Sequence, residues 1–476
     1  MFNLFRISLH LLSKKVSIRQ ETYRRLTVPQ FTVVTGLLVI TFGTLLLATP
    51  LCSHANIGLW EAFFTATSAV TVTGLSIIDI GLDLTFFGQV ILAIMLLTGG
   101  LGLMAITTFL QGFIVSGTEL KTRLDRGKTL DEFGVGGVGR TFRGIAITAS
   151  ILICLGAITL YFFGFNNITS SSERIWVSIF HSISAYNNAG FSLWSNSLQD
   201  YRSNGVVNFV LITLIILGGF GWRVTNDIWI NRRSLKLRNL SLHTRLVIRS
   251  SFILISLGFF GLLFTESLAR GSFFSFMNFD NRILTALFTS VSARTAGFTN
   301  LPISIENVSD SGLLLIMFLM FIGASPGGTG GGIKTTTIAA LMAATRATLR
   351  GQNEIIIRNR QISDKVILKA VGITVGSFLF VLVMALLLSL SNGFNSTENF
   401  SFLEMLFTCI SAFATVGFDL GVTSKLGHVG QLILIIGMFV GRLGILLFLS
   451  AVWQAFNKSK LQHRNRIGYP REDLYV

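Results

Sequence analysis

The sequence predicts an all-α membrane protein built from four repeats, each made of a span, a short half-helix and a second span. Its 476 residues are 51% hydrophobic and 13% charged, whereas soluble domains carry about twice that charged fraction. The apolar residues form blocks close to the roughly 20 residues that a helix needs to cross a bilayer. One short pattern also recurs four times along the chain, which indicates a repeat architecture.

The recurring pattern begins with Ser-Ala and ends in a glycine followed by a mostly apolar residue. A Phe-Thr or Phe-His pair precedes each copy, and the third copy has one residue fewer between Ser-Ala and the glycine. The four copies are Ser68-Ala69-Val70-Thr71-Val72-Thr73-Gly74-Leu75, Ser184-Ala185-Tyr186-Asn187-Asn188-Ala189-Gly190-Phe191, Ser292-Ala293-Arg294-Thr295-Ala296-Gly297-Phe298 and Ser411-Ala412-Phe413-Ala414-Thr415-Val416-Gly417-Phe418. Four spaced copies predict four similar structural units.

The expected elements follow in chain order. Residues 1–30 are basic and mildly amphipathic, which predicts a segment along the inner membrane surface; the first span then ends at Pro50. The repeats cover residues 31–115, 145–229, 246–344 and 366–453, and residues 454–476 form the C-terminus. The eight expected spans are residues 31–49, 87–115, 145–165, 206–229, 246–265, 312–344, 366–390 and 429–453. Residues 59–70, 175–185, 283–293 and 402–412 are apolar but too short to cross, which predicts four re-entrant half-helices.

The net charge of +16 could suggest a nucleic-acid partner, but the positions of the basic residues argue against one. If the apolar blocks are spans, most Lys and Arg residues fall in the termini and in alternate loops, as in cytoplasmic segments. The opposite loops hold few basic residues and many acidic ones. We therefore expect a multi-pass protein of the plasma membrane with both termini in the cytoplasm and no nucleic-acid partner.

Four re-entrant loops around one axis would surround a central pore. Non-helical backbone is tolerated at membrane depth only where it is buried in protein or lines water. Rings of backbone carbonyls can replace the hydration shell of a cation, and glycine permits the backbone conformations that such a loop needs. The expected filter residues are Val72, Thr73, Gly74, Asn188, Ala189, Gly190, Thr295, Ala296, Gly297, Thr415, Val416 and Gly417. The alternative is that these are ordinary turns or close-packing glycines of a membrane bundle.

These four segments resemble the filter segments of the Trk/Ktr/HKT superfamily of potassium and sodium translocating proteins. The resemblance covers all four repeats and is closest to the Ktr-type membrane subunit, because the chain lacks the extra N-terminal pair of spans typical of the Trk type. It implies potassium uptake through a channel-like subunit, with potassium bound at the filter residues. In the family, serine in place of the first filter glycine goes with sodium preference, so Gly74 indicates potassium; a sodium-selective member is the alternative.

The resemblance also implies partners. Ktr-type subunits are typically dimeric and sit on a cytosolic ring of nucleotide-binding regulatory subunits. We therefore expect a homodimer without a cofactor of its own, with nucleotides bound only on the partner. The basic segments at residues 231–249 and 346–369 and the C-terminus are the expected docking face.

A glycine-rich run interrupts the second span of the third repeat. Helix propensity alone excludes a helix through it, so it is either a loose loop or, by resemblance to the family's intramembrane gate loop, a plug beneath the filter. Its residues Gly327, Gly328, Gly330, Gly331 and Gly332 are expected gate residues, together with Lys334 just beyond them. The other three repeats are expected to continue across the membrane at this point.

Arg442 stands where two other repeats have glycine: Gly441-Arg442-Leu443-Gly444 matches Gly99-Gly100-Leu101-Gly102 and Gly218-Gly219-Phe220-Gly221. An arginine at span depth is costly and usually functional. We expect it to face the pore near the plug, as a barrier to cations. The alternative is a snorkelling side chain or a structural ion pair.

Other functions fit the sequence less well. A secondary carrier would need broken helices in symmetry-related pairs, and only one broken span is expected. A membrane enzyme would need clustered His, Cys or paired carboxylates within the spans, which the sequence lacks. The run from Gly134 to Gly139 spells G-x-G-x-x-G, but a dinucleotide site also requires a preceding strand and an acidic residue about twenty positions later.

Overall fold

The structure is a computed structural model, and it describes residues 28–54, 57–102, 135–232, 239–269, 271–352, 354–358, 360–395 and 400–456. Most of the expected N-terminal and C-terminal segments, the end of the span expected at residues 87–115 and Gly134 lie outside these ranges. Within them the chain is mostly helical. The sheet there is a two-stranded hairpin of β1 (Ile356–Ile357) and β2 (Arg360–Gln361).

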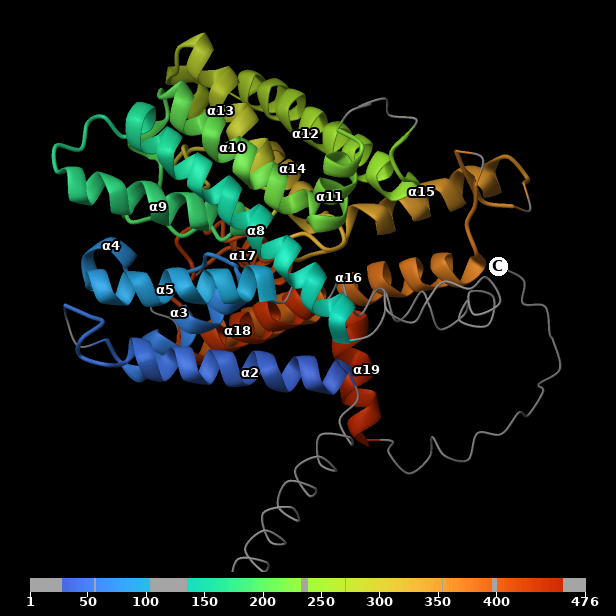
Figure 1. The fold of residues 1–476 in the computed structure, drawn as a ribbon, viewed down its shortest axis with the longest axis horizontal. Coiled ribbons are helices and arrows are strands. Elements are labelled where there is room, and N and C mark those ends of the chain that lie inside the picture. Colours follow the sequence, from blue (N-terminus) through green and yellow to red (C-terminus); the bar gives the residue numbers. More distant parts are fainter. Residues whose placement is uncertain are drawn as a thin grey trace, which may run out of the picture.

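The described helices form four units with one plan, in which a long first helix, a short helix, a loop and a second helix follow one another (Figure 1). The first helices are α2 (Val28–Leu47), α8 (Val135–Thr159), α12 (Leu242–Leu268) and α16 (Asp364–Asn395). The short helices are α3 (Leu59–Thr71), α9 (Ser171–Asn187), α13 (Phe279–Ser292) and α17 (Phe402–Ala414). The second helices are α5 (Phe86–Leu97), α10 (Gly205–Phe220), α14 (Asp310–Phe321) and α18 (His428–Leu443).

Further short elements connect or extend these units. They are α4 (Ile80–Asp83), α11 (Trp222–Ile230), α15 (Thr335–Leu349), α19 (Ile445–Phe456), two π-helical turns (Thr98–Gly102 and Leu160–Gly164) and two 3₁₀ turns (Gln199–Tyr201 and Phe273–Phe276). Side-chain caps mark several helix starts. At α17, the Ser401 hydroxyl accepts a hydrogen bond from the Glu404 amide, and the Glu404 carboxylate accepts one from the Ser401 amide. This helix therefore begins with a complete capping box.

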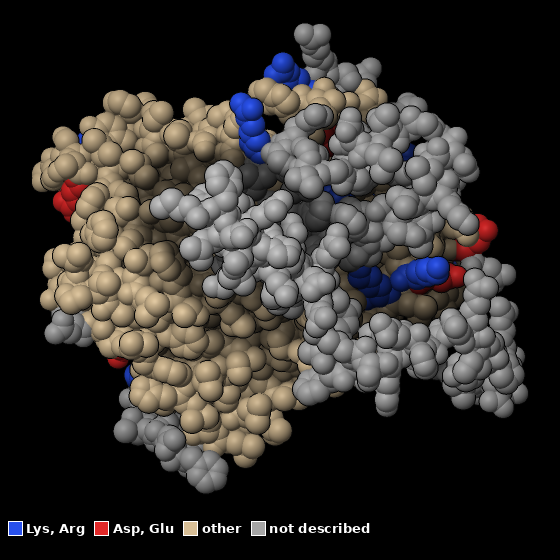
Figure 2. All heavy atoms as spheres, turned by 60° about the horizontal axis from the view of Figure 1, so that its bottom comes forward, with Lys and Arg blue, Asp and Glu red and all other residues tan. Residues whose placement is uncertain are grey.

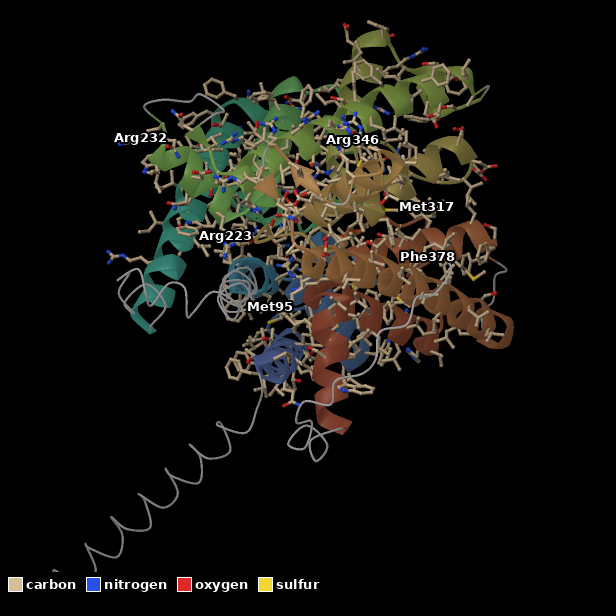
Figure 3. The ribbon with its side chains drawn as sticks, turned by 90° about the vertical axis from the view of Figure 1, so that its right-hand side faces the viewer. Met95, Arg223, Arg232, Met317, Arg346 and Phe378 are labelled. Carbon is tan, nitrogen blue, oxygen red and sulfur yellow. The ribbon has the colours of Figure 1, made fainter. Side chains whose placement is uncertain are left out.

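The four units close into a ring. The second helix of each unit packs against the short helix of the next: α5 against α9, α10 against α13, α14 against α17, and α18 against α3. Figure 3, which views the molecule from one end of the helices, shows the ribbon colours succeeding one another around the molecule in chain order. The short helices therefore lie on the inside of the ring, and at least half of the residues of each are buried.

Apolar side chains cover much of the outer surface. Among the described residues, four helices are long and apolar enough to cross a membrane, or up to six if each bent pair counts as one span. Large apolar side chains such as Phe42, Phe163, Phe260 and Leu386 are exposed on the first helices and their continuations. Figure 2 shows a broad face on which described charged side chains are almost absent. Such a surface suits contact with lipid.

The expectation that only the third repeat has a broken second span is wrong. α10 and α11 meet at a bend of 97°, and α18 and α19 meet at a bend of 100°. Each bend falls at a glycine with positive φ, 82° at Gly221 and 88° at Gly444. Glycine permits this backbone conformation. Apolar residues flank both glycines directly, Phe220 and Trp222 at the first bend and Leu443 and Ile445 at the second, so no polar residue next to the glycine marks the break in the sequence.

Candidate functional site

The loops that follow the four short helices share one backbone feature. In each loop a residue with a side chain adopts a left-handed conformation, and a glycine with positive φ follows two residues later. The pairs are Val72 and Gly74, Asn188 and Gly190, Thr295 and Gly297, and Thr415 and Gly417. A left-handed conformation is uncommon outside glycine and costly for the β-branched Val72, Thr295 and Thr415. Its recurrence indicates that the surrounding structure imposes it.

Backbone hydrogen bonds fix where three of the short helices end. The Val72 amide donates to the Ala69 carbonyl at 3.1 Å, and the Thr73 amide donates to the Ser68 carbonyl at 2.8 Å. The second and fourth loops repeat both bonds at the equivalent residues. The third loop differs because Ala296, next to the left-handed Thr295, donates to Ser292. Because the third copy has one residue fewer, this hydrogen bond spans four residues instead of five. The glycine that follows still has positive φ.

The serine of each Ser-Ala pair ties its helix to the loop. Ser68 and Ser411 each accept a hydrogen bond from the amide of the loop glycine, at 3.1 Å in both cases. Ser184 and Ser292 instead donate to the carbonyl of the residue after the glycine, at 2.8 and 2.6 Å. All four serines are buried. The sequence pattern alone indicates no role for these serines, whereas the structure shows that they hold the loops.

The four loop glycines pack against one another's loops in a closed cycle. A β-carbon at any of them would collide with the carbonyl oxygen of the residue before the next loop glycine, counting around the ring. The pairs, glycine first, are Gly74 and Ala189, Gly190 and Ala296, Gly297 and Val416, and Gly417 and Thr73. The structure thus brings the twelve residues expected at the filter into one ring of backbone around a common axis.

The glycine-rich segment between α14 and α15 lies against this ring. Its ends are held together by a bridge between Ile322 and Ile333. The Gly331 amide donates to the Thr415 hydroxyl at 2.9 Å, and a β-carbon at Gly330 would collide with the Thr295 hydroxyl. We call residues 323–334 the central loop. It therefore touches the left-handed residues of two of the four loops.

The central loop also docks on the second unit. The amides of Ser325 and Thr329 donate to the carbonyls of Gly219 and Gly218, both at 3.2 Å. Gly327 lies against Gly221, the glycine of the α10–α11 bend, and a β-carbon at Gly221 would collide with the Gly327 backbone. Most of the loop is buried, so it is a packed structural element and not a loose connection.

Arg442 joins the central loop to the first unit. Its side chain is 8% exposed, and its guanidinium donates to the carbonyls of Thr329, Gly99 and Gly100, the last two at 2.8 and 3.4 Å. No carboxylate is among these partners. A buried guanidinium here is balanced by carbonyl dipoles of two units and not by an ion pair.

Lys334 holds the central loop from its far end. Its ammonium donates to the carbonyls of Gly330 at 2.7 Å and Gly331 at 3.4 Å. The side chain is half-buried. The two cations expected at the gate, Lys334 and Arg442, thus both bind carbonyls of the same loop.

Glycines near the ends of the second helices, in the helix itself or in the turn that follows it, let these helices approach the ring closely. β-Carbons at Gly99, Gly218 and Gly441 would collide with the carbonyls of Val70, Tyr186 and Phe413, respectively. Each of those carbonyls belongs to the residue two positions before a left-handed loop residue. These contacts support the alignment that places Arg442 opposite Gly100 and Gly219.

Known proteins share both the sequence pattern and the fold of this chain. The family model TrkH, described as a cation transport protein, matches residues 7–459. The chain belongs to this family. The match confirms the resemblance that the four glycine segments indicate, and members of the family are ion transporters, which argues against an enzyme.

Relatives cover nearly the whole chain. The chain is 32% identical to "Ktr system potassium uptake protein B" of Bacillus subtilis over 95% of its own length and 97% of that protein. It is 30% identical to "Potassium/sodium uptake protein NtpJ" of Enterococcus hirae over 96% and 99%. The crystal structure of the potassium transporter TrkH from Vibrio parahaemolyticus superposes with a TM-score of 0.72 at 19% identity, covering 90% of this chain and 84% of that one. The last comparison supports the fold.

Proposed function

We propose that this protein is the potassium-translocating, channel-like subunit of a Ktr/Trk-type uptake system in the plasma membrane. The closed cycle of four loop glycines carries the proposal, because each loop glycine lies against a backbone carbonyl of the next loop, so the backbones of four loops meet there. A ring of carbonyls on that line can replace the hydration shell of a cation. The names of the relatives from Bacillus subtilis and Vibrio alginolyticus, both potassium uptake proteins, support potassium as the ion.

The filter is proposed to consist of the three residues of each loop that end at Gly74, Gly190, Gly297 and Gly417. Gly74 favours potassium over sodium by resemblance to the family. A sodium-selective or mixed transporter is the alternative ion choice, since one relative is named a potassium/sodium uptake protein.

The central loop is proposed as the gate. It contacts Thr295 and Thr415 next to the proposed filter, and Lys334 and Arg442 bind its carbonyls. Opening would require these contacts to separate. Eight spans and four re-entrant half-helices around a central pore, with both termini in the cytoplasm, complete the proposed architecture.

The partners are proposed from the relatives. Two of them are named as proteins of a "Ktr system", which implies further components. We propose a homodimer on a cytosolic nucleotide-binding regulatory ring, docked at the basic segments 231–249 and 346–369.

A secondary carrier remains the second candidate, and one observation favours it. The bends at Gly221 and Gly444 occur at matching positions of the second and fourth units. Paired broken helices are what alternating access uses. The bends turn α11 and α19 away from α10 and α18. The four loops of the ring still pack against one another in a closed cycle, which favours the channel-like subunit.

Reconstituted protein distinguishes the two candidates. Potassium flux into liposomes is measured with and without an opposing sodium or proton gradient, at a clamped membrane potential. A channel-like subunit predicts flux that follows the potassium gradient alone. Potassium accumulation against its own gradient, driven by sodium or protons, would establish a carrier.

A further inference from the structure

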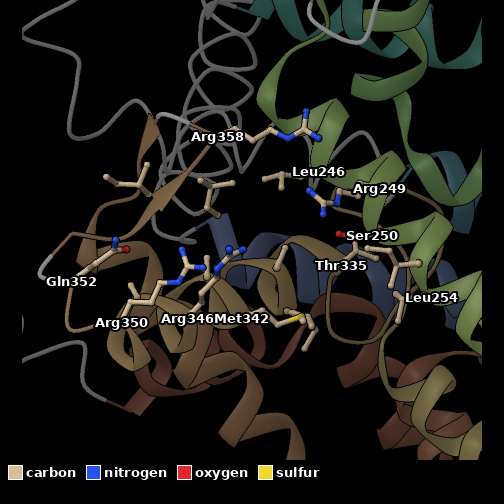
Figure 4. A pocket seen from close by; sticks show the side chains of 17 residues that line it. Leu246, Arg249, Ser250, Leu254, Thr335, Met342, Arg346, Arg350, Gln352 and Arg358 are labelled. Carbon is tan, nitrogen blue, oxygen red and sulfur yellow. The ribbon is translucent and has the colours of Figure 1, made fainter.

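A cavity of about 640 Å³ lies between the first half of α12, the helix α15 and the β1–β2 hairpin (Figure 4). This volume is typical of a site for a small molecule or for part of a larger one. No residue of the central loop lines the cavity, and the lining residue nearest to it in sequence is Thr335, the first residue of α15. It is therefore separate from the proposed filter.

Four arginines from three elements line this cavity: Arg249 from α12, Arg346 and Arg350 from the end of α15, and Arg358 from the hairpin. Figure 4 shows the guanidinium groups of Arg249, Arg346 and Arg350 turned into the same space, with Arg358 reaching over it. Within the described residues, no Asp or Glu lines the cavity, and these four guanidinium groups make no hydrogen bond or ion pair. Four guanidinium groups without an acidic partner among the described residues favour a ligand with several anionic oxygens, and phosphate matches the guanidinium fork best.

The other side of the cavity is apolar. Ile253 and Leu254 of α12 face Ile338 and Met342 of α15. Met342 is 68% exposed, and Ile253 is 50% exposed. A free phosphate or a nucleotide phosphate would leave this half of the site without a partner. A ligand with an anionic head and an apolar tail would fill both halves.

The position of the cavity along α12 fits a membrane interface. Arg245 and Arg249 lie near the start of this helix, and the sixteen residues from Ser250 to Thr265 carry no charge. α12 is apolar and long enough to cross a membrane. The hydrocarbon layer would thus begin just beyond Arg249, which places the four arginines at headgroup level.

We propose that this cavity binds an anionic phospholipid, with its phosphate between the four arginines and its acyl chain against Ile253, Ile338 and Met342. Basic pockets between membrane helices hold anionic headgroups by charge and by guanidinium-phosphate hydrogen bonds. The four arginines lie within segments 231–249 and 346–369, which are also proposed to dock the regulatory ring, so the ring would contact these segments at other residues. The inference concerns lipid binding and is independent of which ion the protein carries.

The test is lipid retention by protein in nanodiscs of phosphatidylcholine with and without phosphatidylglycerol, read by native mass spectrometry after extraction. The wild type is expected to retain phosphatidylglycerol in preference to phosphatidylcholine. The double variant R346Q/R350Q is expected to lower that preference by about thirtyfold. Each arginine near an anionic headgroup adds a similar amount of binding free energy, so the loss of two multiplies the roughly fivefold effect of one. Arg360→Gln is the matched control, because Arg360 is exposed on the same hairpin and does not line the cavity.

Several results would overturn the proposal. One is an unchanged preference in R346Q/R350Q, and another is an equal loss in Arg360→Gln, which would indicate bulk charge. Thermal stabilisation of protein in neutral nanodiscs by inorganic phosphate or ATP, equal to that by phosphatidylglycerol, would show that the apolar half contributes nothing. If the double variant does not fold, Arg358→Gln, which alters only the hairpin, replaces it and is expected to lower the preference about fivefold.

Discussion

Each loop glycine is required by its neighbour in the ring. Gly74 has φ 95° and lies against the Ala189 carbonyl, so a side chain there would meet both backbone strain and a collision. The same holds around the cycle to Gly417, which lies against Thr73. A change at one glycine therefore moves a carbonyl of the neighbouring loop, and its effect spreads beyond its own residue.

Gly74→Ser is predicted to lower the preference for potassium over sodium by about tenfold. The displaced Ala189 carbonyl and a strain of about 1–3 kcal/mol at positive φ would spoil the spacing of the ring. Competing potassium and sodium flux in liposomes measures the preference.

Gly421→Ser is the control for that experiment. Gly421 also has positive φ, 84°, but no atom lies within 4 Å of a β-carbon placed there. Its variant should keep the wild-type ion preference. Equal ion preference in Gly74→Ser and the wild type would contradict the filter assignment.

Arg442→Ala is predicted to raise potassium flux. It removes a buried cation together with its hydrogen bonds to Thr329, Gly99 and Gly100. A barrier lowered by about 1.4 kcal/mol gives a tenfold rise, and hydrogen bonds to charged groups contribute about 1.5–3 kcal/mol each. Arg442→Lys keeps the charge without the planar fork, so its potassium flux should lie between those of the wild type and Arg442→Ala.

Flux assays on folded protein check this order. Arg282→Ala is the control, because Arg282 also donates to backbone carbonyls, those of Met277 and Ser275, away from the central loop. Identical flux in the alanine and lysine variants of Arg442 would assign this residue a structural role instead.

At the scale of elements, the bends and the central loop meet at Gly221. This glycine stands at the bend between α10 and α11 and also lies against Gly327. Gly444 stands at the bend between α18 and α19, but no atom lies within 4 Å of a β-carbon placed there. The two bends are similar in angle and differ in their contact with the loop. This difference provides a matched pair of substitutions.

Gly221→Ala is predicted to change potassium flux severalfold, and Gly444→Ala to change it little. Both variants incur backbone strain of about 1–3 kcal/mol, so both should lose thermal stability. Only the first also pushes the central loop from its place. Flux and melting temperature measured on both variants check the prediction; equal flux changes would mean that the bend and not the loop contact matters.

Deletion of Gly330 and Gly331 is predicted to raise flux. It removes the bond from Gly331 to Thr415 and two carbonyls that bind Lys334, while the bridge from Ile322 to Ile333 outside the deletion can still close the loop. Lower flux in a variant with unchanged helix content would identify the loop as a structural support.

The sequence predicted the elements well where a local pattern decides them. The short helices end within two residues of the expected positions in all four units, because Ser-Ala and the loop glycine are local signals. The bends at Gly221 and Gly444 were missed, since each glycine stands directly between two apolar residues and no local signal marks a break. The basic cavity also escaped prediction, because Arg249 and Arg358 meet only through the packing of α12, α15 and the hairpin.

At the scale of the whole molecule, two independent observations describe the same closure. Second helices pack on the short helices of the next unit around the full circle, and loop glycines face the carbonyls of the next loop in the same order. The sequence indicated four units through its repeated pattern. Their cyclic order required the structure, since no local signal specifies which unit follows which in space.

The measurement that tests the central claim most directly is the position of a potassium substitute in the protein. Crystals grown in rubidium or thallium salts give anomalous difference density for the ion. The account predicts density on the axis enclosed by Gly74, Gly190, Gly297 and Gly417, and its loss in Gly74→Ser. Density only at other sites, or an axis empty of ion at saturating rubidium, would contradict the assignment of these loops as the ion filter.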